Sequence, residues 1–361
     1  MSFLSLLLKL ILLITFNKYF ITFFILWAIV CYFLINNLFK NCEKYKNADK
    51  SLYEKYPEFL RRDWDNWVFM RLYLGALFLL WIKLFGVLST IIGAWIAVRY
   101  FTNGKKLEEK NEELTNKLKA IARIAGRCFL ISCGIFTSHK YVDIDYEKYL
   151  GKLYDKSENY SASICNHISW LDIMIMMGDN GCGFITNIGV KNYYFIGTIC
   201  TWIGSIYVDR QSKESRSDSL STLEKKLKDI YEKREFSSLC IFPEGTTSNG
   251  QYLLPFKKGA FTSFLPLQPN VIKIESQKSL SLAMDIIEIT NHLLLVCCVP
   301  YHFVEILKFP VFSPNEYFMK TYIPNNKKES EEDWVVYSDV IRKIMMESSG
   351  LKNGNNSFEG K

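Results

Sequence analysis

The sequence predicts an α/β protein, a β-sheet flanked by helices, preceded by helices embedded in a membrane. Three observations predict this class. The first hundred residues contain two long apolar blocks. From about residue 129, short apolar runs alternate with longer helical patterns, which is typical of an α/β sheet. The 361 residues, 49% of them hydrophobic, leave room for both a membrane part and one large core.

The first apolar block, residues 1–39, is expected to be a membrane segment. Only Lys9 and Lys18 are charged between Leu4 and Asn36, which fits one long span or a tight hairpin. A secretory signal peptide is the alternative, although the two lysines interrupt it and no small-x-small cleavage site precedes the next apolar stretch. Residues 40–66 are dense in charge of both signs and predict a solvated connector.

The second apolar block, residues 67–101, has basic residues before it and after it. Because positive charge prefers the cytoplasmic side, both ends of the block should lie on that side. We therefore expect a hairpin that enters and leaves by the same face, with Gly86 near the bend. A single crossing through Tyr73–Ala97 is the alternative.

Residues 102–128 predict an amphipathic helix, because leucine and isoleucine recur three or four positions apart among many charges. This helix could lie on the bilayer surface or pack onto the following domain. The net charge of +7 is spread along the chain, which suits an anionic membrane surface and lacks the basic aromatic arrays of nucleic-acid binders. The ten cysteines include no Cys-x-x-Cys pair, which predicts reduced thiols rather than disulfides or zinc ligands.

The globular domain is expected to span residues 129–350, before a polar tail at 351–361. Short apolar runs predict strands at 141–145, 161–165, 183–186, 205–208, 238–242, 271–275 and 303–309. Helices are predicted from 169 onward and at 212–233, 258–265 and 332–348, with further apolar segments at 193–202 and ending at Val299.

The central stretch is Asn166-His167-Ile168-Ser169-Trp170-Leu171-Asp172, a polar turn between a predicted strand and an apolar helix. On one helix, His167 and Asp172 would be rotated about 140° apart. If the helix begins at Ser169, however, Asp172 lies in its first turn and can accept a hydrogen bond from the imidazole. That arrangement is a base with its orienting carboxylate. The alternative is a capping box of Ser169 and Asp172, with His167 as an ordinary loop residue.

Other polar groups also follow predicted strands, where open α/β sheets place their sites. Arg210 ends one strand and could grip a phosphate with two hydrogen bonds, or form a surface ion pair. Glu244, Gly245 and Thr246 form a tight turn directly after another strand, a pattern more specific than an ordinary turn. Lys257 stands near the start of the next predicted helix, where an anion would be favoured.

Three motifs in this order resemble the first three motifs of the glycerolipid acyltransferase superfamily: Asn166-His167-x-Ser169-x-x-Asp172, Gly204-x-Ile206-x-Val208-x-Arg210 and Phe242-Pro243-Glu244-Gly245-Thr246. Further stretches, among them Phe309-Pro310-Val311-Phe312-Ser313-Pro314, are similar to the lysophosphatidylcholine acyltransferase branch and extend the resemblance over about residues 130–350. The fourth motif departs from the family pattern, being present only as Leu265-Pro266-Leu267-Gln268-Pro269-Asn270-Val271, so no acyl-chain preference is implied.

The resemblance implies the superfamily fold, a mixed sheet flanked by helices, and a membrane-bound lysophospholipid O-acyltransferase. Such an enzyme transfers a fatty acyl group from acyl-CoA to the free hydroxyl of a lysophospholipid, here with a lysophosphatidylcholine-like acceptor favoured. His167 would be the general base and Asp172 its orienting group, whereas Arg210 would hold the phosphate. The glycerol site would be shaped by Glu244, Gly245 and Thr246, with Lys257 as a further anion ligand. This mechanism needs no metal, and acyl-CoA takes part as a co-substrate, so no cofactor or metal is expected.

The expected partners are therefore acyl-CoA, a lysophospholipid and the lipid bilayer, and not nucleic acid. The expected location is the endoplasmic reticulum membrane, with the catalytic domain facing the cytosol. Three alternatives remain within reach of the sequence: an acyltransferase for lysophosphatidic acid or glycerol 3-phosphate, a CoA-independent transacylase, and a non-catalytic membrane scaffold on the same fold. Backbone N–H groups near Gly245 are candidates for stabilising the oxyanion.

Overall fold

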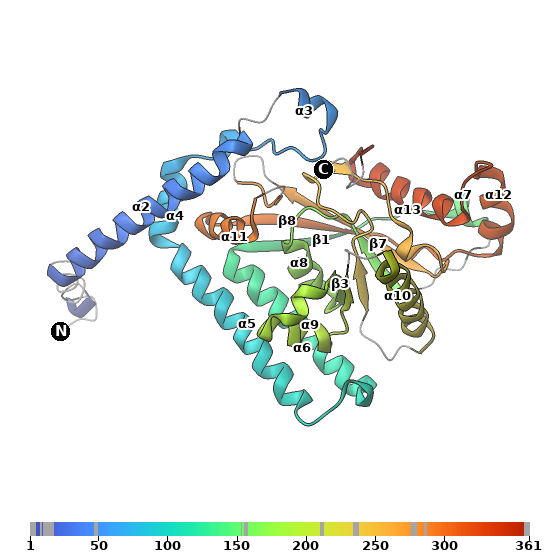
Figure 1. Cartoon of the computed structure of the whole chain (residues 1–361), viewed down its shortest axis with the longest axis horizontal. Coiled ribbons are helices and arrows are strands. Elements are labelled where there is room, and N and C mark those ends of the chain that lie inside the picture. The colour runs from blue at the N-terminus through green and yellow to red at the C-terminus, as the bar shows by residue number, and fades with distance from the viewer. Residues whose placement is uncertain are drawn as a thin grey trace.

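The computed structural model describes residues 5–7, 9, 18–46, 50–152, 154, 158–209, 213–233, 238–275, 280–284 and 287–356. These residues form an α/β domain with a long N-terminal helix that projects away from it (Figure 1). Arg210, the expected phosphate ligand, lies outside the described residues.

A mixed β-sheet forms the centre of the domain and confirms the predicted fold class. Its strands, in the order in which they lie side by side, are β1 (Ile135–Tyr141), β8 (His302–Lys308), β7 (Leu267–Glu275), β2 (Ala162–Cys165), β5 (Leu239–Ile241), β3 (Gly183–Asn187) and β4 (Ile206–Val208). β7 and β8 are antiparallel, and the other neighbouring pairs are parallel. A second, smaller sheet pairs β6 (Tyr252–Leu253) with β9 (Lys352–Asn353).

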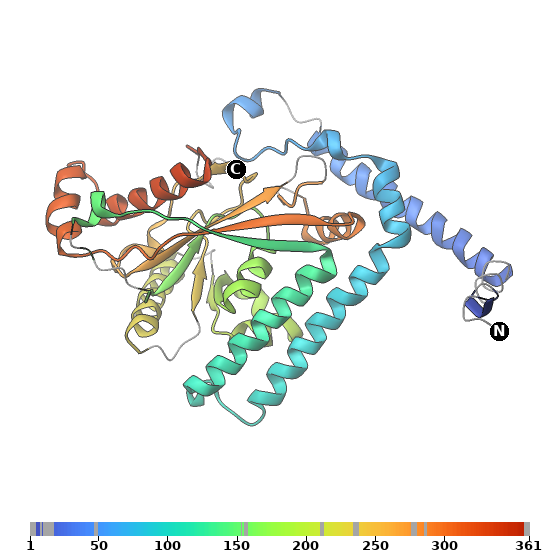
Figure 2. The same cartoon turned by 180° about the vertical axis from the view of Figure 1, so that it is seen from behind.

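Helices cover both faces of this sheet, so the domain has three layers (Figures 1 and 2). Alternating strand residues divide between two cores; Val271 belongs to one and Ile272 to the other. One face is covered by α6 (Glu112–Cys133), α8 (Leu171–Asn180) and α11 (Ile289–Cys298), and the other by α10 (Lys213–Lys233) and α13 (Asp333–Ser349). The shorter helices are α7 (Glu147–Leu150), α9 (Tyr194–Trp202) and α12 (Ile323–Asn326).

Close contact between α6 and α8 fixes the helix that begins at the central polar turn. The contact runs through Gly126 and Gly178, since a Cβ atom at Gly126 would lie only 2.4 Å from the backbone nitrogen of Gly178. This packing fixes the position of α8, the helix whose first turn carries Asp172.

The N-terminal part consists of α2 (Lys18–Lys46), α3 (Lys50–Lys55), α4 (Phe69–Phe78) and α5 (Leu80–Thr102). The expected bend at Gly86 is wrong, because α5 is continuous there and the helix axis is interrupted at Leu79 instead. Gly86 serves close packing: a Cβ atom there would lie 2.7 Å from Oγ of Ser132 on α6. The hairpin in this region is formed by α5 and α6, which lie side by side in both views (Figures 1 and 2).

Three further expectations are corrected. The strand expected at 141–145 is β1 at Ile135–Tyr141, an edge strand whose residues after Ile135 are exposed and therefore show no apolar alternation. The helix expected at 258–265 is a single 3-10 turn, Lys258–Ala260. The connector is not solvated throughout, since Glu58 is 1% and Arg61 4% exposed.

Candidate active site

The central polar turn joins the end of β2 to the start of α8, and it brings His167 and Asp172 together. Nδ1 of His167 lies 2.9 Å from Oδ2 of Asp172, so the expected hydrogen bond is present. The imidazole is 20% exposed, whereas the carboxylate is fully buried. Because Nδ1 is engaged by Asp172, Nε2 is the ring nitrogen that can accept a proton from a substrate.

Asp172 also holds the backbone of the same turn. Its Oδ2 accepts hydrogen bonds from the N–H groups of Ile168, at 2.5 Å, and Ser169, at 2.8 Å. Asp172 therefore supplies its half of the predicted capping box while it also orients the imidazole. The other half is absent, because Oγ of Ser169 accepts the N–H of Leu171 at 3.3 Å and the N–H of Asp172 donates to the carbonyl of Ser169. The turn and the imidazole are fixed by a single buried group.

Glu244 lies behind His167, because β5 is the neighbour of β2 and the two parallel strands end at the same edge. Its Oε1 accepts the N–H of His167 at 2.7 Å, and its Oε2 accepts the N–H of Leu254 at 2.8 Å. Burial raises the pKa of Glu244 to about 8, although the two N–H donors favour the charged form. With 2% exposure and both oxygens engaged by backbone, this side chain supports the histidine from behind.

Two groups that contact His167 received no role in the sequence reasoning. The ring of Phe242 stacks on the imidazole with a centroid separation of 4.3 Å and an interplanar angle of 16°. The N–H of Ser248 donates to the carbonyl of His167 at 2.8 Å. Both residues flank Glu244 in the loop that follows β5, so the position of that loop directly after a buried strand was the signal that could have found them.

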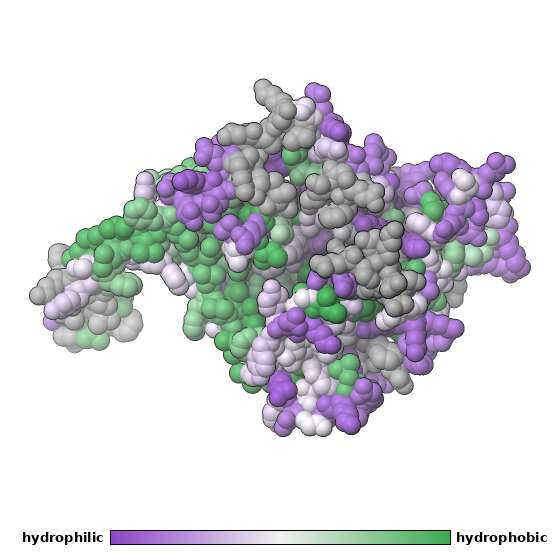
Figure 3. Space-filling view, viewed as in Figure 1, coloured by the Kyte–Doolittle hydropathy of each residue, from purple (hydrophilic) through white to green (hydrophobic). Residues whose placement is uncertain are grey.

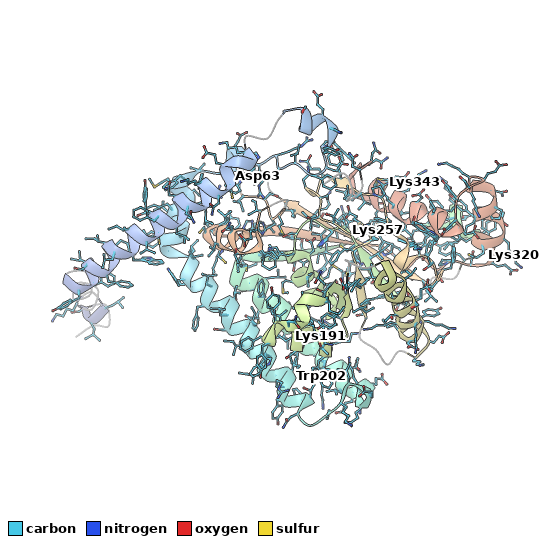
Figure 4. All side chains as sticks on the ribbon, viewed as in Figure 1. Asp63, Lys191, Trp202, Lys257, Lys320 and Lys343 are labelled. Carbon is cyan, nitrogen blue, oxygen red and sulfur yellow. The ribbon has the colours of Figure 1, made fainter. Side chains whose placement is uncertain are left out.

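Next to Glu244, the backbone of Gly245 packs closely against the side chain of Lys257. Gly245 has a φ of +71°, which favours glycine, and a Cβ atom there would lie 2.9 Å from Cε of Lys257. The N–H of Lys257 donates to the carbonyl of Pro243 at 2.9 Å. Figure 4 labels Lys257 over the central part of the α/β domain. Thr246 is 9% exposed.

The arrangement provides a base, a buried carboxylate that orients it and a cation next to the glutamate turn. Among the residues that the structure describes, no group of three His, Cys, Asp or Glu side chains is placed to hold a metal ion. A histidine and a carboxylate in this geometry can serve proton transfer, with the imidazole as the base and the carboxylate stabilising its protonated form.

Comparisons with known proteins match this part of the chain. Residues 156–274 match the family model described as Acyltransferase. The lysophospholipid acyltransferase LPEAT1 of Arabidopsis thaliana is 29% identical over 55% of this chain and 46% of its own length. The lysophosphatidylcholine acyltransferase of Drosophila melanogaster is 22% identical over 80% of this chain and 51% of its own length.

A solved structure similar to this one is the 1-acyl-sn-glycerophosphate (LPA) acyltransferase PlsC from Thermotoga maritima, with a TM-score of 0.47 and 14% identity over 78% of this chain and 98% of that chain. The chain spans about half the length of the two curated relatives. The segment that matches the family model contains every residue expected at the site: His167, Asp172, Arg210, Glu244, Gly245, Thr246 and Lys257.

Proposed function

We propose a reaction for this chain on the premise that it belongs to the glycerolipid acyltransferase superfamily, in the branch of the lysophospholipid acyltransferases. The reaction is transfer of a fatty acyl group from acyl-CoA to the free hydroxyl of a lysophospholipid, with a lysophosphatidylcholine-like acceptor favoured. The observation that carries the proposal is the 2.9 Å contact between a partly exposed His167 and a buried Asp172. An alcohol is a poor nucleophile, and such a pair supplies the base it needs.

In the proposed mechanism, Nε2 of His167 takes the proton of the acceptor hydroxyl while its oxygen attacks the thioester carbonyl. The tetrahedral intermediate then collapses, the carbon–sulfur bond breaks, and the imidazolium returns the proton to the CoA thiolate. Asp172 holds the tautomer and stabilises the imidazolium, as the carboxylate does in a Ser-His-Asp triad. The substrate hydroxyl takes the place of the serine, so no acyl-enzyme forms and no cofactor takes part.

The remaining site residues are assigned to substrate binding and support. Arg210 is proposed to hold the acceptor phosphate, on the grounds of its sequence motif, and Lys257 to contribute a second positive charge. Gly245 and Thr246 shape the glycerol site, and N–H groups near Gly245 stabilise the oxyanion. Glu244 changes role: because both its oxygens accept backbone hydrogen bonds, we assign it to positioning His167 rather than to substrate contact.

Membrane attachment is proposed through one side of the molecule. Two described helices, at Tyr19–Glu43 and Leu80–Thr102, are long and apolar enough to cross a membrane. Hydrophobic residues cover α2 and continue onto α5 (Figure 3). The exposed apolar side chains of α5 include Trp81, Ile82, Phe85, Leu88, Ile92 and Ile96. A continuous apolar face of this kind is typical of a membrane-bound surface.

Two contacts favour α5 lying on the bilayer rather than across it. α6 runs along α5 and carries charged residues, which are costly in hydrocarbon: Glu112, Glu113, Lys117, Lys119, Arg123 and Arg127. In addition, Lys83 of α5 donates to the carbonyls of Cys133 and Val299 in the α/β domain, at 2.8 and 2.5 Å. We therefore assign the deeper insertion to α2 and propose that the domain rests on the cytosolic face of an endoplasmic reticulum membrane.

The test is a panel of acceptors offered to the purified full chain in lipid nanodiscs, with and without acyl-CoA. We expect acylated lysophospholipid only when acyl-CoA is present, with lysophosphatidylcholine among the best acceptors. Preference for lysophosphatidic acid or glycerol 3-phosphate would change the substrate, and transfer without acyl-CoA would indicate a transacylase. Binding of acyl-CoA without turnover of any acceptor would refute the enzymatic function and favour a membrane scaffold.

A further inference from the structure

The four backbone polar groups of His167 and Ile168 are each held by a partner from elsewhere in the chain or from Asp172. The two N–H groups donate to Glu244 and Asp172, as described above. The carbonyl of His167 accepts the N–H of Ser248 at 2.8 Å, and that of Ile168 accepts the N–H of Met284 at 3.2 Å. The last two partners belong to loop segments outside the helices and strands, which need a support of their own to be held in place.

Both segments are supported by the connector between α2 and α4. Asn249, next to Ser248, donates from Nδ2 to the carbonyls of Pro57 and Leu60, at 2.8 and 2.9 Å. Its own N–H donates to the carbonyl of Glu58 at 2.8 Å. The loop that holds His167 is therefore attached to three backbone carbonyls within a stretch of four connector residues, 57–60.

Arg61 supports the second segment. Its guanidinium donates to the carbonyl of Ala283 at 2.6 Å and to that of Ser281 at 2.7 Å, which places it next to Met284. Asp63 pairs with Arg61 at 2.6 Å and accepts the N–H of Ser281 at 2.6 Å. Arg61 is 4% exposed, so this charge has been removed from water for contacts to one short stretch of backbone.

The same guanidinium also lies near the aromatic side chains that pack against α2. It is 5.2 Å from the ring centroid of Trp67, and Trp67 meets Phe39 of α2 edge-on at 5.9 Å. Figure 4 labels Asp63 where the end of α2 meets the domain. A continuous set of contacts thus leads from the apolar N-terminal helix through Arg61 to the carbonyl next to the catalytic base.

We propose that Arg61 is a positioning residue of the active site, and that the connector holds the turn of His167 in its reactive geometry through Arg61 and Asn249. The inference rests on the proposed function for its kinetic readout. A buried arginine that served stability alone would lower the fraction of folded protein. A positioning residue lowers kcat of the protein that remains folded, because a small displacement of a catalytic group is costly to rate.

The test compares Arg61→Ala, Arg61→Lys and Asn249→Ala with the exposed neighbour Arg62→Ala as a matched control. All are measured as the full chain in nanodiscs, with rates normalised to folded protein. We expect Arg61→Ala to lower kcat about 10- to 100-fold with both KM values within about twofold. Arg61→Lys should recover part of the loss, since an ammonium keeps the charge but lacks the fork that reaches both carbonyls. Arg62→Ala should match the wild type.

Asn249→Ala should show the same split between kcat and KM, and it keeps the test decisive if Arg61→Ala does not fold. Unchanged kcat in the folded variants, or an equal loss in Arg62→Ala, would overturn the proposal.

Amide hydrogen exchange separates this proposal from the proposed function. In Arg61→Ala, peptides covering 166–172 and 280–284 should exchange faster, whereas β8 should keep its protection. This readout needs no turnover. Inactive wild-type protein would count against acyl transfer alone, whereas unchanged exchange at 166–172 would count against the connector as the support of the turn.

Discussion

The imidazole of His167 stacks on the phenyl ring of Phe242, at a centroid distance of 4.3 Å and an angle of 16° between the planes. Phe242 in turn lies parallel to Phe184, at 6.1 Å and 4°. The histidine is thus held on one face by an aromatic ring and at Nδ1 by Asp172. Both contacts restrict rotation of the ring and so fix the direction of Nε2, as the proposed mechanism requires.

Phe242→Leu should lower kcat about 2- to 10-fold, the range expected from losing an aromatic contact of about 0.5–1.5 kcal/mol. Leucine keeps an apolar neighbour but offers no flat surface to the imidazole. The KM for acyl-CoA should change little. Steady-state kinetics of the folded variant check this, and wild-type kcat would show that the stacking does not contribute to orientation.

Asp172→Asn should separate the two roles of this carboxylate. The amide oxygen can take the position of Oδ2 and still accept the N–H groups of Ile168 and Ser169. The free energy of unfolding should therefore fall by only about 0.5–2 kcal/mol. The same oxygen would stay opposite Nδ1 of His167, but the neutral amide would no longer stabilise the imidazolium that forms during transfer, which can lower turnover by up to about 10⁴-fold. Paired measurements of thermal unfolding and turnover test this. If turnover falls no more than the loss of folded protein explains, Asp172 serves only to stabilise the turn, and its role in orienting His167 is contradicted.

Glu244→Gln should change how stability depends on pH. Burial raises the pKa of Glu244 from 4.5 to about 8, so below about pH 4.5 the carboxyl is protonated both folded and unfolded. Between those values only the unfolded chain ionises, and the wild type should lose stability as pH rises from about 4.5 to 8. Glutamine does not ionise, so the difference in Tm between variant and wild type should change over this interval. Parallel Tm curves would contradict the raised pKa.

The connector and the active-site loop should lie on the same side of the membrane, because Asn249 contacts the carbonyls of Pro57 and Leu60 directly. Cysteines introduced at Ser51 and Gln251, both exposed, should react equally with a membrane-impermeant maleimide in intact microsomes. The background would lack the accessible thiols Cys128 and Cys200. Labelling at only one position would mean that α4 and α5 cross the bilayer once.

The pairing of His167 with Asp172 could be predicted from sequence because it is local. Both residues belong to one strand-to-helix junction, and the start of the helix determines their separation. The strands β2, β3, β4 and β5 were also predicted within about two residues, since each is a short apolar run between turns. Element boundaries of this kind depend mainly on neighbouring residues.

The roles of Glu244 and Arg61 could not be predicted, because their partners are distant in sequence. Glu244 accepts the N–H of a residue 77 positions away, and Arg61 donates to a carbonyl 222 positions away. A charged stretch is usually solvated, but here Asp63 pairs with Arg61 and backbone carbonyls take up the remaining donors. The bend predicted at Gly86 was wrong for a related reason: this glycine makes room for the neighbouring helix α6, a distant part of the chain, and not for a turn.

The turnover of His167→Ala tests the central claim most directly. With acyl-CoA and the best lysophospholipid acceptor, the variant should lose about 10²- to 10⁴-fold in kcat, the scale for removing one positioned general base. Its affinity for acyl-CoA should stay near that of the wild type, because the base acts only when the hydroxyl attacks. Turnover within a few-fold of the wild type, in folded protein that binds acyl-CoA, would contradict the assignment of His167 as the base.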